Sequence, residues 1–503
     1  MKNKILDNRI IYYIFIFLVV MVVALLNLSS APLNKGVTQN DSAVFQIMGK
    51  GMLEGQVIYK DLFDHKGPVM YLINAIAYLI SPQIGLFIVE IIFIYVGTIF
   101  IFKTSEIFIN KKISLIMSLL YVMLTFLNIS GGNFTEEYAI TFTSIALYFI
   151  IRIIYKNEYE NKLLWVGIGA TFALNFFIKP TYIAIWMAFG IIQLIYSIKE
   201  KKIKELLRYI FYMIIGIMIV IVPIAIYLIL NNDINDFINA FFVMNMKYSE
   251  AGILKKIKAF LILIKRYKFV GCIVIGIMCN ILILFNKKIN LKNKWFVTCF
   301  FIISIILTAW APNAYGHYLI QLAPTVTLEV IGLCAYIKEY FKINEKESKI
   351  LKQLPRNLIV IMIIFCIVLV ATAMISKCTK NYSGILQNGK VVNQELDKLK
   401  EYLKEDDEMI VLGNQPYYYI YLNKQPQYKY FFQLPIMLYD NSIKEKNKKY
   451  IMENNPKMLI KYMEGYSEEE FNEIYGRDLE NYIRNNYEEH VSKNFKYYVL
   501  NEK

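Results

Sequence analysis

The chain has 503 residues, of which 57% are hydrophobic, and it carries a formal net charge of +15. A soluble globular protein of this length is less apolar, so the composition excludes that class and indicates an integral membrane protein. A helix needs about 20 mostly apolar residues to cross a bilayer, and such stretches recur up to about residue 376. We therefore expect about eleven transmembrane helices within 1–376, followed by a small extracytoplasmic α/β domain in 377–503.

The positive charge does not indicate a nucleic-acid partner, because most Lys and Arg residues gather in short segments between apolar stretches. Under the positive-inside rule, such segments lie in the cytoplasm. The rule predicts a multi-pass plasma-membrane protein with a cytoplasmic N-terminus and an outer C-terminal domain. The basic segments are 103–112, 152–162, 199–208, 287–294 and 338–356.

The first apolar segment runs from Ile10 to Leu28 and follows basic residues, as a secretory signal peptide would. Its apolar run is longer than a usual signal core, and many more spans follow. We therefore expect an uncleaved first helix.

The first outer loop is predicted to be long, from Ser29 to about Gln83. Within it, Pro68–Ile80 has about thirteen residues, too few to cross the membrane. Counting it as a crossing would also place every later basic segment outside. We therefore predict a helix that lies along or dips into the outer face. Asn231–Lys265 is predicted to be a second long outer loop.

The C-terminal domain is predicted from short apolar runs separated by polar, helix-forming segments. Met409–Leu412, Met458–Ile460 and Lys496–Leu500 are expected to be strands. Asp397–Leu403 and Ser467–Asn486 are expected to be helices. The six cysteines form no CxxC motif, so neither a disulfide framework nor a zinc knuckle is expected.

Charged residues near the membrane are costly and often functional. Asp41 opens the amphipathic stretch DSAVFQIMGKGMLEG in the first outer loop. It could cap a helix, or it could act as a general base that takes a proton from an attacking hydroxyl.

The densest polar group is Asp64-His65-Lys66. Lys66 could reach lipid headgroups or hold a phosphate leaving group. His65 and His317 are predicted on the same face, where together with a carboxylate they could hold a divalent cation. They could equally be unrelated interface residues.

Two more outer turns carry charge. In Gly131-Gly132-Asn133-Phe134-Thr135-Glu136-Glu137, Thr135 could cap the next helix and the glutamates would favour its positive end. Lys179-Pro180 could be a simple helix breaker, or Lys179 could be a functional cation at the outer edge.

These motifs, in this order, resemble those of bacterial GT-C glycosyltransferases, the relatives of protein O-mannosyltransferases and of the lipid A aminoarabinose transferase. The resemblance covers roughly residues 1–340, and it is carried by the stretch from Asp41 to Pro68, by GGNFTEEYA and by GHYLIQLAP. It implies a polyprenyl-phosphate sugar donor, membrane lipids as surroundings, and transfer on the outer face with inversion.

Carried over by motif, the resemblance makes Asp41 the essential first-loop acid, and Glu136 or Glu137 the second outer acid. Lys66 matches the basic residue that faces the donor phosphate, and we add Lys179 to that role. The vicinity of the substrate or a metal is assigned to Asp64, His65, His317 and Tyr318. The sequence departs from the family at Ser42, where an acidic pair is common, and at His65, where the aminoarabinose transferase has Glu.

The sequence therefore predicts an inverting membrane glycosyltransferase with Asp41 as base and a glycan, lipid or protein acceptor. A membrane transporter or lipid flippase is the main alternative, and a non-catalytic envelope scaffold is another. A transporter would have its polar groups at mid-depth, whereas the charges here gather at the predicted outer edge.

Overall fold

The computed structural model describes 8–34, 40–267, 269–285, 291–343, 364, 367–381, 395–431, 437, 440–462, 467–492 and 495–501. Parts of four predicted features lie outside these residues: the basic segments 287–294 and 338–356, the last predicted span, and the start of the C-terminal domain. The chain divides into two compact units. Unit 1 contains Met1–Ala31, Phe87–Ala225 and Ala251–Tyr382, and unit 2 contains Pro32–Leu86, Ile226–Glu250 and Ser383–Lys503.

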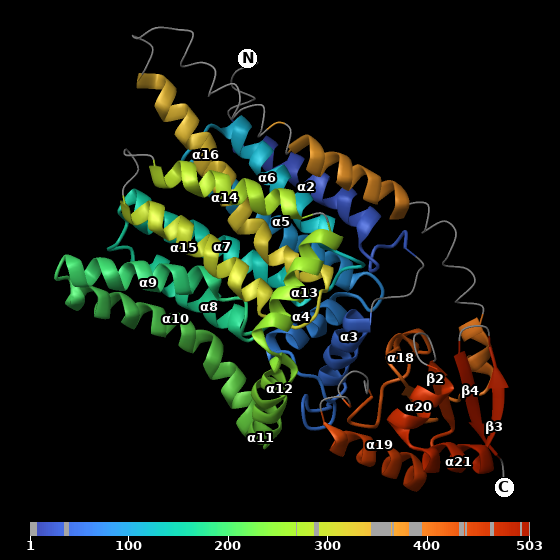
Figure 1. The fold of residues 1–503 in the computed structure, drawn as a ribbon. Coiled ribbons are helices and arrows are strands. Elements are labelled where there is room, and N and C mark those ends of the chain that lie inside the picture. The colour runs from blue at the N-terminus through green and yellow to red at the C-terminus, as the bar shows by residue number, and fades with distance from the viewer. Residues whose placement is uncertain are drawn as a thin grey trace. The chain divides into compact units, whose positions relative to one another are not determined.

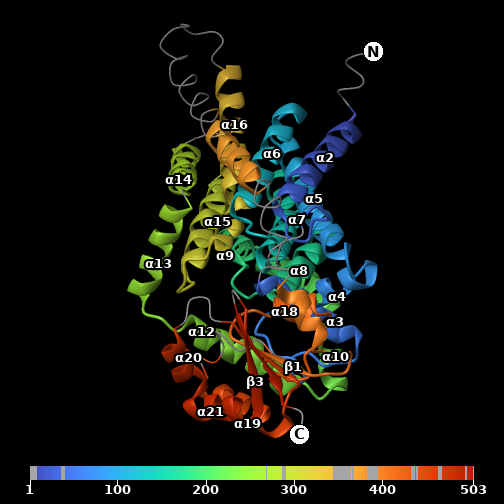
Figure 2. The same ribbon diagram turned by 90° about the vertical axis from the view of Figure 1, so that its right-hand side faces the viewer.

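Unit 1 is a helical bundle, in which α2, α5, α6 and α16 run roughly side by side (Figures 1 and 2). Its helices, with one 3₁₀ helix (η2), are α2 (Arg9–Asn27), α5 (Gly85–Glu106), α6 (Lys111–Asn128), α7 (Thr135–Lys156), α8 (Lys162–Phe176), α9 (Ala184–Lys199), α10 (Ile203–Leu230), α13 (Ile253–Arg266), α14 (Val270–Phe285), α15 (Leu291–Ala309), η2 (Gly316–Leu322) and α16 (Ala323–Ile343). Residues 367–381 are also helical.

Among the described residues, seven helices are long and apolar enough to cross a membrane. The α13–α14 pair is bent by 104° and gives an eighth if it forms one span. Helices α8 and α9 are apolar but shorter, with 15 and 16 residues. The chain is thus a multi-pass membrane protein, and the number eleven stays a prediction.

The start of the chain is confirmed as a long apolar helix, because α2 matches the predicted first segment within one residue at each end. Residues facing the bundle recur along it at helical spacing: Tyr12, Ile16, Val20 and Ala24 are buried, whereas Ile10, Ile14 and Leu18 are exposed. Exposed apolar side chains on such a helix suit contact with lipid.

Unit 2 joins the first predicted outer loop to the C-terminal part of the chain. The loop contains α3 (Asn40–Leu53) and α4 (Pro68–Ile80). The predicted helix over Pro68–Ile80 is confirmed, with Pro68 at its first turn. Gly49 of α3 lies against the backbone of α4, since an added Cβ would come 2.6 Å from the Ala75 nitrogen.

The middle segment of unit 2 is helical rather than an irregular loop, which the sequence analysis did not predict. It contains α11 (Ile234–Phe237), a π-helix (η1, Ile238–Met244) and α12 (Asn245–Ser249). It packs on the first loop: Tyr59 and Phe237 rings lie 5.5 Å apart, and Asn245 Nδ2 donates to the His65 carbonyl at 2.6 Å.

The C-terminal part of unit 2 holds a four-stranded sheet in the order β1-β2-β4-β3. Strand β2 pairs parallel with β1 and antiparallel with β4, which pairs antiparallel with β3. Its elements are a 3₁₀ helix (η3, Lys398–Glu401), β1 (Met409–Leu412), α18 (Tyr417–Tyr421), α19 (Asn441–Asn454), β2 (Met458–Tyr462), α20 (Glu468–Tyr475), α21 (Arg477–Asn486), β3 (Tyr487–Val491) and β4 (Phe495–Leu500).

The three predicted strands are confirmed. The helix predicted over Ser467–Asn486 is two helices, because the chain turns at Gly476, whose φ of +94° is left-handed. The helix predicted over Asp397–Leu403 is largely confirmed, because 395–397 are α-helical and continue into η3, with a turn at Tyr402.

The predicted first loop docks on the C-terminal part through side-chain and backbone contacts. Asn40 Nδ2 donates to the Asn414 carbonyl at 2.6 Å, Gln56 Nε2 donates to the Pro426 carbonyl at 2.9 Å, and the Phe63 amide donates to the Lys429 carbonyl at 2.9 Å. Lys429 also pairs with Asp236 at 2.6 Å. Three segments distant in the sequence therefore form one body.

Candidate active site

The turn before α7 contains three consecutive residues with positive backbone φ angles. Gly131, Gly132 and Asn133 have φ values of 92°, 90° and 58°. Glycine adopts this region freely, and asparagine tolerates it. The turn presents the Asn133 amide to Glu90 Oε1 at 2.5 Å, and the Tyr138 hydroxyl donates to Asn133 Oδ1 at 2.6 Å. The GGN motif thus fixes the start of α7.

The structure separates the two glutamates of this motif. Glu137 accepts a hydrogen bond from the Phe134 amide at 3.2 Å, so it caps the helix. Thr135 is the first residue of α7 and not its cap, contrary to the sequence interpretation, and its hydroxyl donates to Glu136 Oε2 at 2.9 Å. Glu136 is buried, with 1% of its surface exposed.

Glu136 meets Lys179 from the turn between α8 and α9. The Lys179 ammonium lies 3.5 Å from Glu136 Oε1, and the Tyr182 hydroxyl donates to the same oxygen. Burial, with Glu136 adding to it, raises the pKa of the Tyr182 phenol well above its ordinary value. Lys179 also lies over two rings, 5.1 Å from Tyr182 and 4.6 Å from Tyr318.

Lys179-Pro180 does end a helix, since α8 stops at Phe176. The turn that follows is tied down by Asn175, whose Nδ2 donates to the Tyr182 carbonyl at 3.1 Å. The helix-breaking and site interpretations of this dipeptide are therefore compatible.

His317 lies in the same unit, within an aromatic stack. Its ring is 4.4 Å from Phe134 and 5.6 Å from Tyr315, and Tyr318 meets it edge-on at 4.7 Å. Phe134 precedes the α7 start, so the stack links η2 to the turn that carries Glu136.

Sequence reasoning missed Glu90 of α5, which is 1% exposed. It accepts hydrogen bonds from the Asn133 amide and the Ser30 hydroxyl, and it interacts with the carboxyl of Glu137. Its signal was present in the sequence, because a lone acid within an apolar span is costly and tends to have a role.

Unit 2 holds the other predicted residues. Asp64 is 2% exposed, and its Oδ2 accepts from the Tyr71 hydroxyl at 2.9 Å. Its Oδ1 lies 3.3 Å from His65 Nδ1, and the Lys66 ammonium donates to His65 Nε2 at 2.8 Å. Because ammonium can only donate, neutral His65 carries its proton on Nδ1, facing Asp64. Burial opposes the charge of Asp64, but Lys66 and His65 outweigh it and hold its pKa well below the ordinary value.

The backbone of this cluster is fixed by two buried tyrosines. The Tyr59 hydroxyl donates to the Lys66 carbonyl at 2.8 Å, and the Lys66 amide donates to the Tyr71 hydroxyl at 3.0 Å. His65 also stacks on Tyr248 at 5.5 Å. Lys66 is thus mounted on a rigid turn.

Asp41 lies in the first turn of α3 and is half-buried. The helix begins at Asn40, so Asp41 is inside it rather than at its cap. Among the described residues its carboxylate has no hydrogen-bond or ion-pair partner. An acid in this position is stabilised by the helix dipole and keeps its oxygens available.

The predicted site residues fall into two groups, one in each unit. Asp41 and Asp64-His65-Lys66 belong to unit 2, and Glu136, Glu137, Lys179, His317 and Tyr318 belong to unit 1.

The predicted divalent metal does not fit the side chains present. Within the described ranges, no three or more His, Cys, Asp or Glu side chains are arranged to hold a metal ion. His65 Nε2, which would face a cation, already accepts from Lys66, and His317 is stacked between rings.

Comparison with solved structures shows the fold. ArnT from Cupriavidus metallidurans bound to undecaprenyl phosphate matches with a TM-score of 0.64 and 11% identity over 97% of both chains. Its apo state matches with 0.62 and 11% over the same shares. The apo oligosaccharyltransferase of Archaeoglobus fulgidus matches with 0.50 and 12%, over 97% of this chain and 74% of that one.

ArnT, the lipid A aminoarabinose transferase, and the archaeal oligosaccharyltransferase are both GT-C glycosyltransferases. The predicted fold class, a polytopic GT-C-like helical membrane protein with a small C-terminal sheet, is therefore confirmed. Comparison with curated proteins gives no match. Residues 2–379 match the model of a family described as the competence-induced protein Ccs4 N-terminal domain, and the chain therefore belongs to that family.

Proposed function

We propose that this chain is a membrane glycosyltransferase that moves a sugar from a polyprenyl-phosphate donor to a hydroxyl acceptor on the outer membrane face. One observation carries the proposal: the fold matches, over 97% of both chains, an enzyme whose structure holds undecaprenyl phosphate. Each unit also holds a buried acid and a half-buried lysine suited to that chemistry: Asp64 and Lys66 in unit 2, and Glu136 and Lys179 in unit 1.

We assign phosphate-binding roles to Lys66 in unit 2 and to Lys179 in unit 1. Each ammonium is mounted on a turn fixed by buried tyrosine hydroxyls or an amide. A cation held in place before the reaction stabilises the charge that develops on the leaving phosphate, and such preorganised groups are worth several kcal/mol. Glu136 then positions Lys179 and is not a base, because Thr135, Tyr182 and Lys179 already contact its carboxylate.

Asp41 is the proposed general base. The acceptor hydroxyl gives its proton to the Asp41 carboxylate, its oxygen forms a bond to the anomeric carbon, and the bond from that carbon to the phosphate oxygen breaks. Polyprenyl phosphate leaves with the electron pair, and the anomeric configuration inverts. Asp41 suits this role because it is half-buried and its oxygens are not engaged by the described residues.

We place unit 2 on the outer side of the membrane, and the charge distribution and the three chain segments that form the unit support this placement. A hydrogen-bonded body made from the first loop, Ile226–Glu250 and Ser383–Lys503 must have all three segments on one side of the membrane. The positive-inside rule makes that side the outer one. Glu137 is assigned a structural capping role in place of a catalytic one.

The proposal is tested in cells that produce the chain. Chromosomal Asp41→Asn should cause the lipid-linked sugar to accumulate and one sugar to disappear from an envelope glycan, as measured by mass spectrometry. Glu54→Gln is the matched control: it removes one carboxylate from the same loop, from an exposed pair with Lys50 that contributes little. Unchanged envelope glycans in the Asp41→Asn cells would contradict the proposal.

A further inference from the structure

Helix α13 of unit 1 carries a concentrated positive charge. Its sequence, ILKKIKAFLILIKR, has five basic residues and no acidic residue. Most of the helix belongs to the second predicted outer loop, where the positive-inside rule disfavours basic residues. Membrane topology therefore does not account for this charge, whereas an anionic partner would.

The side chains of α13 point in three directions. Ala259 and Leu263 are buried and face the bundle. An exposed apolar side, which covers an arc of about 100° at helical spacing, consists of Ile253, Leu254, Ile257 and Leu261. A similar arc beside it, which also contains Ile262, holds four exposed basic residues that we call the basic side of α13: Lys255, Lys258, Lys265 and Arg266.

This arrangement suits the boundary between the tails and the headgroups of a lipid layer. There an amphipathic helix buries its apolar side among the tails and turns its basic side to the headgroups. The hydrocarbon core is a poor place for α13, because charged side chains are costly at that depth. Helix α14 follows after a bend of 104°, and its sequence VGCIVIGIMCNILILF has no charged residue. The bend thus separates a charged helix from an apolar one.

Contacts with the rest of unit 1 hold α13 in place. Leu263 is 1% exposed, and the Tyr267 ring lies against Gly316, where an added Cβ would come 2.4 Å from it. In the first turn, the Lys256 ammonium lies 4.0 Å from the ring centre of Trp310. Trp310 directly follows a helix that is long and apolar enough to cross the membrane. Tryptophan is enriched at the membrane–water interface, so this contact favours an interfacial position for α13.

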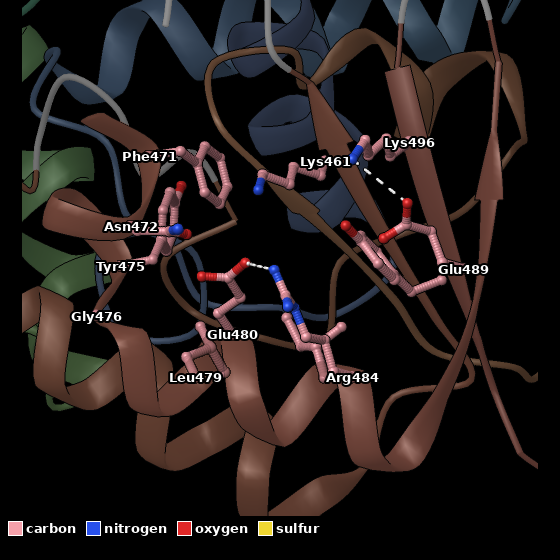
Figure 3. A pocket seen from close by; sticks show the side chains of 12 residues that line it. Lys461, Phe471, Asn472, Tyr475, Gly476, Leu479, Glu480, Arg484, Glu489 and Lys496 are labelled. Carbon is pink, nitrogen blue, oxygen red and sulfur yellow. Dashed lines mark hydrogen bonds and ion pairs between the residues drawn. The ribbon is translucent and has the colours of Figure 1, made fainter. Parts of the chain in front are cut away.

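The basic side is available for a partner. Among the residues that the structure describes, none of its four side chains has a hydrogen bond or an ion pair. The charges around the cavity of the C-terminal part differ, because Arg484 pairs with Glu480 at 2.5 Å and Lys496 pairs with Glu489 at 3.3 Å (Figure 3). The chain therefore does pair exposed basic residues elsewhere, but not on α13.

We propose that α13 lies on the outer membrane surface and that its basic side binds the headgroup phosphates of anionic phospholipids. Lysine and arginine form charge-assisted hydrogen bonds with phosphate, and arginine can do so with two parallel bonds. A zwitterionic headgroup carries its own cation, so its attraction to the basic side is weaker. This inference does not depend on sugar transfer.

The test measures which lipids surround α13. A bimane fluorophore is attached at Leu254→Cys, an 84% exposed position on the apolar side, in a cysteine-free full chain in nanodiscs. Nitroxide-labelled phosphatidylglycerol or phosphatidylcholine then quenches the fluorophore on contact. We expect half-quenching by phosphatidylglycerol at a mole fraction at least about threefold lower. In about 1 M NaCl, where charges are screened within about 3 Å, this preference should disappear.

Two controls locate the effect. Bimane at Ile219→Cys, an exposed position in an uncharged stretch of α10, should be quenched equally by both lipids. The combined variant of the basic side, Lys255→Gln, Lys258→Gln, Lys265→Gln and Arg266→Gln, should lose the preference at Leu254→Cys. It should still be quenched by both lipids, because its apolar side is intact, and this separates lost binding from misfolding.

Four results would overturn the proposal. Equal quenching by both lipids at low salt would remove the preference, and no quenching by either would place α13 away from the membrane. An unchanged preference in the combined variant would exclude the basic side. Loss of the preference on adding an equal mole fraction of polyprenyl phosphate would assign the basic side to that lipid instead.

Discussion

At the scale of single residues, the Glu136–Lys179 pair shows how the fold holds charge at the edge of an apolar bundle. The carboxylate is 1% exposed and the ammonium side chain 18%, so both have lost most of their hydration. Such a pair gains little net free energy over an apolar pair, but removing one partner leaves a buried charge uncompensated. Each partner therefore offsets the free-energy cost of burying the other.

This cost predicts a strong coupling between the two residues. Lys179→Met should lower the free energy of unfolding by about 3 to 5 kcal/mol, because Glu136 stays buried without its cation. The double variant Glu136→Gln with Lys179→Met should recover part of that loss. Thermal unfolding in detergent measures both, and strictly additive losses would contradict the coupling.

Asp233 predicts a pH dependence of stability. It follows α10 and is fully buried, and within the described part of the chain neither carboxylate oxygen has a hydrogen-bond partner. Burial, and then the neighbouring Asp236, raise its pKa from 3.8 to about 7. The folded chain therefore keeps this proton to a higher pH than the unfolded chain. The contribution of Asp233 to stability falls as pH rises from about 4 to about 7 and then stays level.

The Asp233→Asn variant lacks the titrating carboxyl group, so it should not lose this stability as the pH rises. At about 1.4 kcal/mol per pKa unit, the variant should gain at most about 4 kcal/mol above pH 7 and almost nothing near pH 4. Its melting temperature should thus exceed that of wild type at pH 8 and match it at pH 4. Asp397→Asn, at an exposed carboxylate, should match wild type at both. A gain that is the same at both pH values would count against the buried-acid explanation.

Sequence reasoning selected the charged residues of the candidate site but not their partners. Asp41, Lys66, Glu136 and Lys179 stand beside turn signals that can be read locally. Glu90 and Asp233 were missed because their importance depends on burial by segments distant in the sequence. The choice between Glu136 and Glu137 depended on which carboxylate faces Lys179, and adjacent residues cannot be separated by pattern alone.

At the scale of elements, the packing of α3 on α4 explains why a thirteen-residue apolar helix is stable without crossing a membrane. The buried face of α4 includes Met70, Tyr71 and Ile73. The side-chain amide of Asn74 donates a hydrogen bond to the Met70 carbonyl at 3.0 Å. Gly49 permits close approach of the two helices. The short apolar run and Pro68 made the α4 helix predictable. The sequence pattern did not predict that α4 packs against α3.

Gly49→Ala tests that contact. The added Cβ would come 2.6 Å from the Ala75 nitrogen, so the helices must separate and unit 2 should lose about 1 to 3 kcal/mol. Gly190→Ala in α9 is the control: its Cβ would meet nothing within 4 Å, and helix propensity predicts a gain of up to about 1 kcal/mol. Equal melting temperatures for both variants would exclude a close α3–α4 crossing.

The strands show where pattern reasoning ends. Strands β1, β2 and β4 are apolar runs, and their prediction succeeded because each is mostly buried. Strand β3, with the sequence YEEHV, has mostly partly or fully exposed residues and lies at the sheet edge, so it lacked an apolar signal. The break at Gly476 was also missed, because glycine inside a polar helical stretch is only a weak stop signal.

At the scale of the whole molecule, unit 2 consists of three separate chain segments, and this limits the possible membrane topologies. Its three segments must share one side, so an even number of crossings separates each from the next. Between the first two segments, α5, α6, α7 and α10 are long enough to cross, and α8 and α9 are shorter apolar helices, so the number of crossings is even whether or not both short helices cross. This parity agrees with the predicted topology, and no sequence pattern revealed that the loop and the C-terminal domain form one body.

Because the three segments of unit 2 are predicted on the outer side of the membrane, a reagent added outside the cell should reach all three. In a cysteine-free background, Glu54→Cys, Glu250→Cys and Glu445→Cys occupy exposed positions in the three segments of unit 2. All three should react with a membrane-impermeant maleimide in intact cells, whereas Lys204→Cys, in a predicted cytoplasmic segment, should react only after lysis. Protection of any one of the three in intact cells would refute the shared outer face.

The central claim is sugar transfer from a polyprenyl-phosphate donor, and turnover by the purified chain tests it most directly. Nanodisc-embedded wild-type protein should release polyprenyl phosphate from a radiolabelled lipid-linked sugar in the presence of envelope extract as acceptor. Asp41→Asn should lower this rate by about 100-fold or more, with Glu54→Gln unchanged. No release by folded wild-type protein across a panel of donor sugars, or wild-type release by Asp41→Asn, would contradict the account.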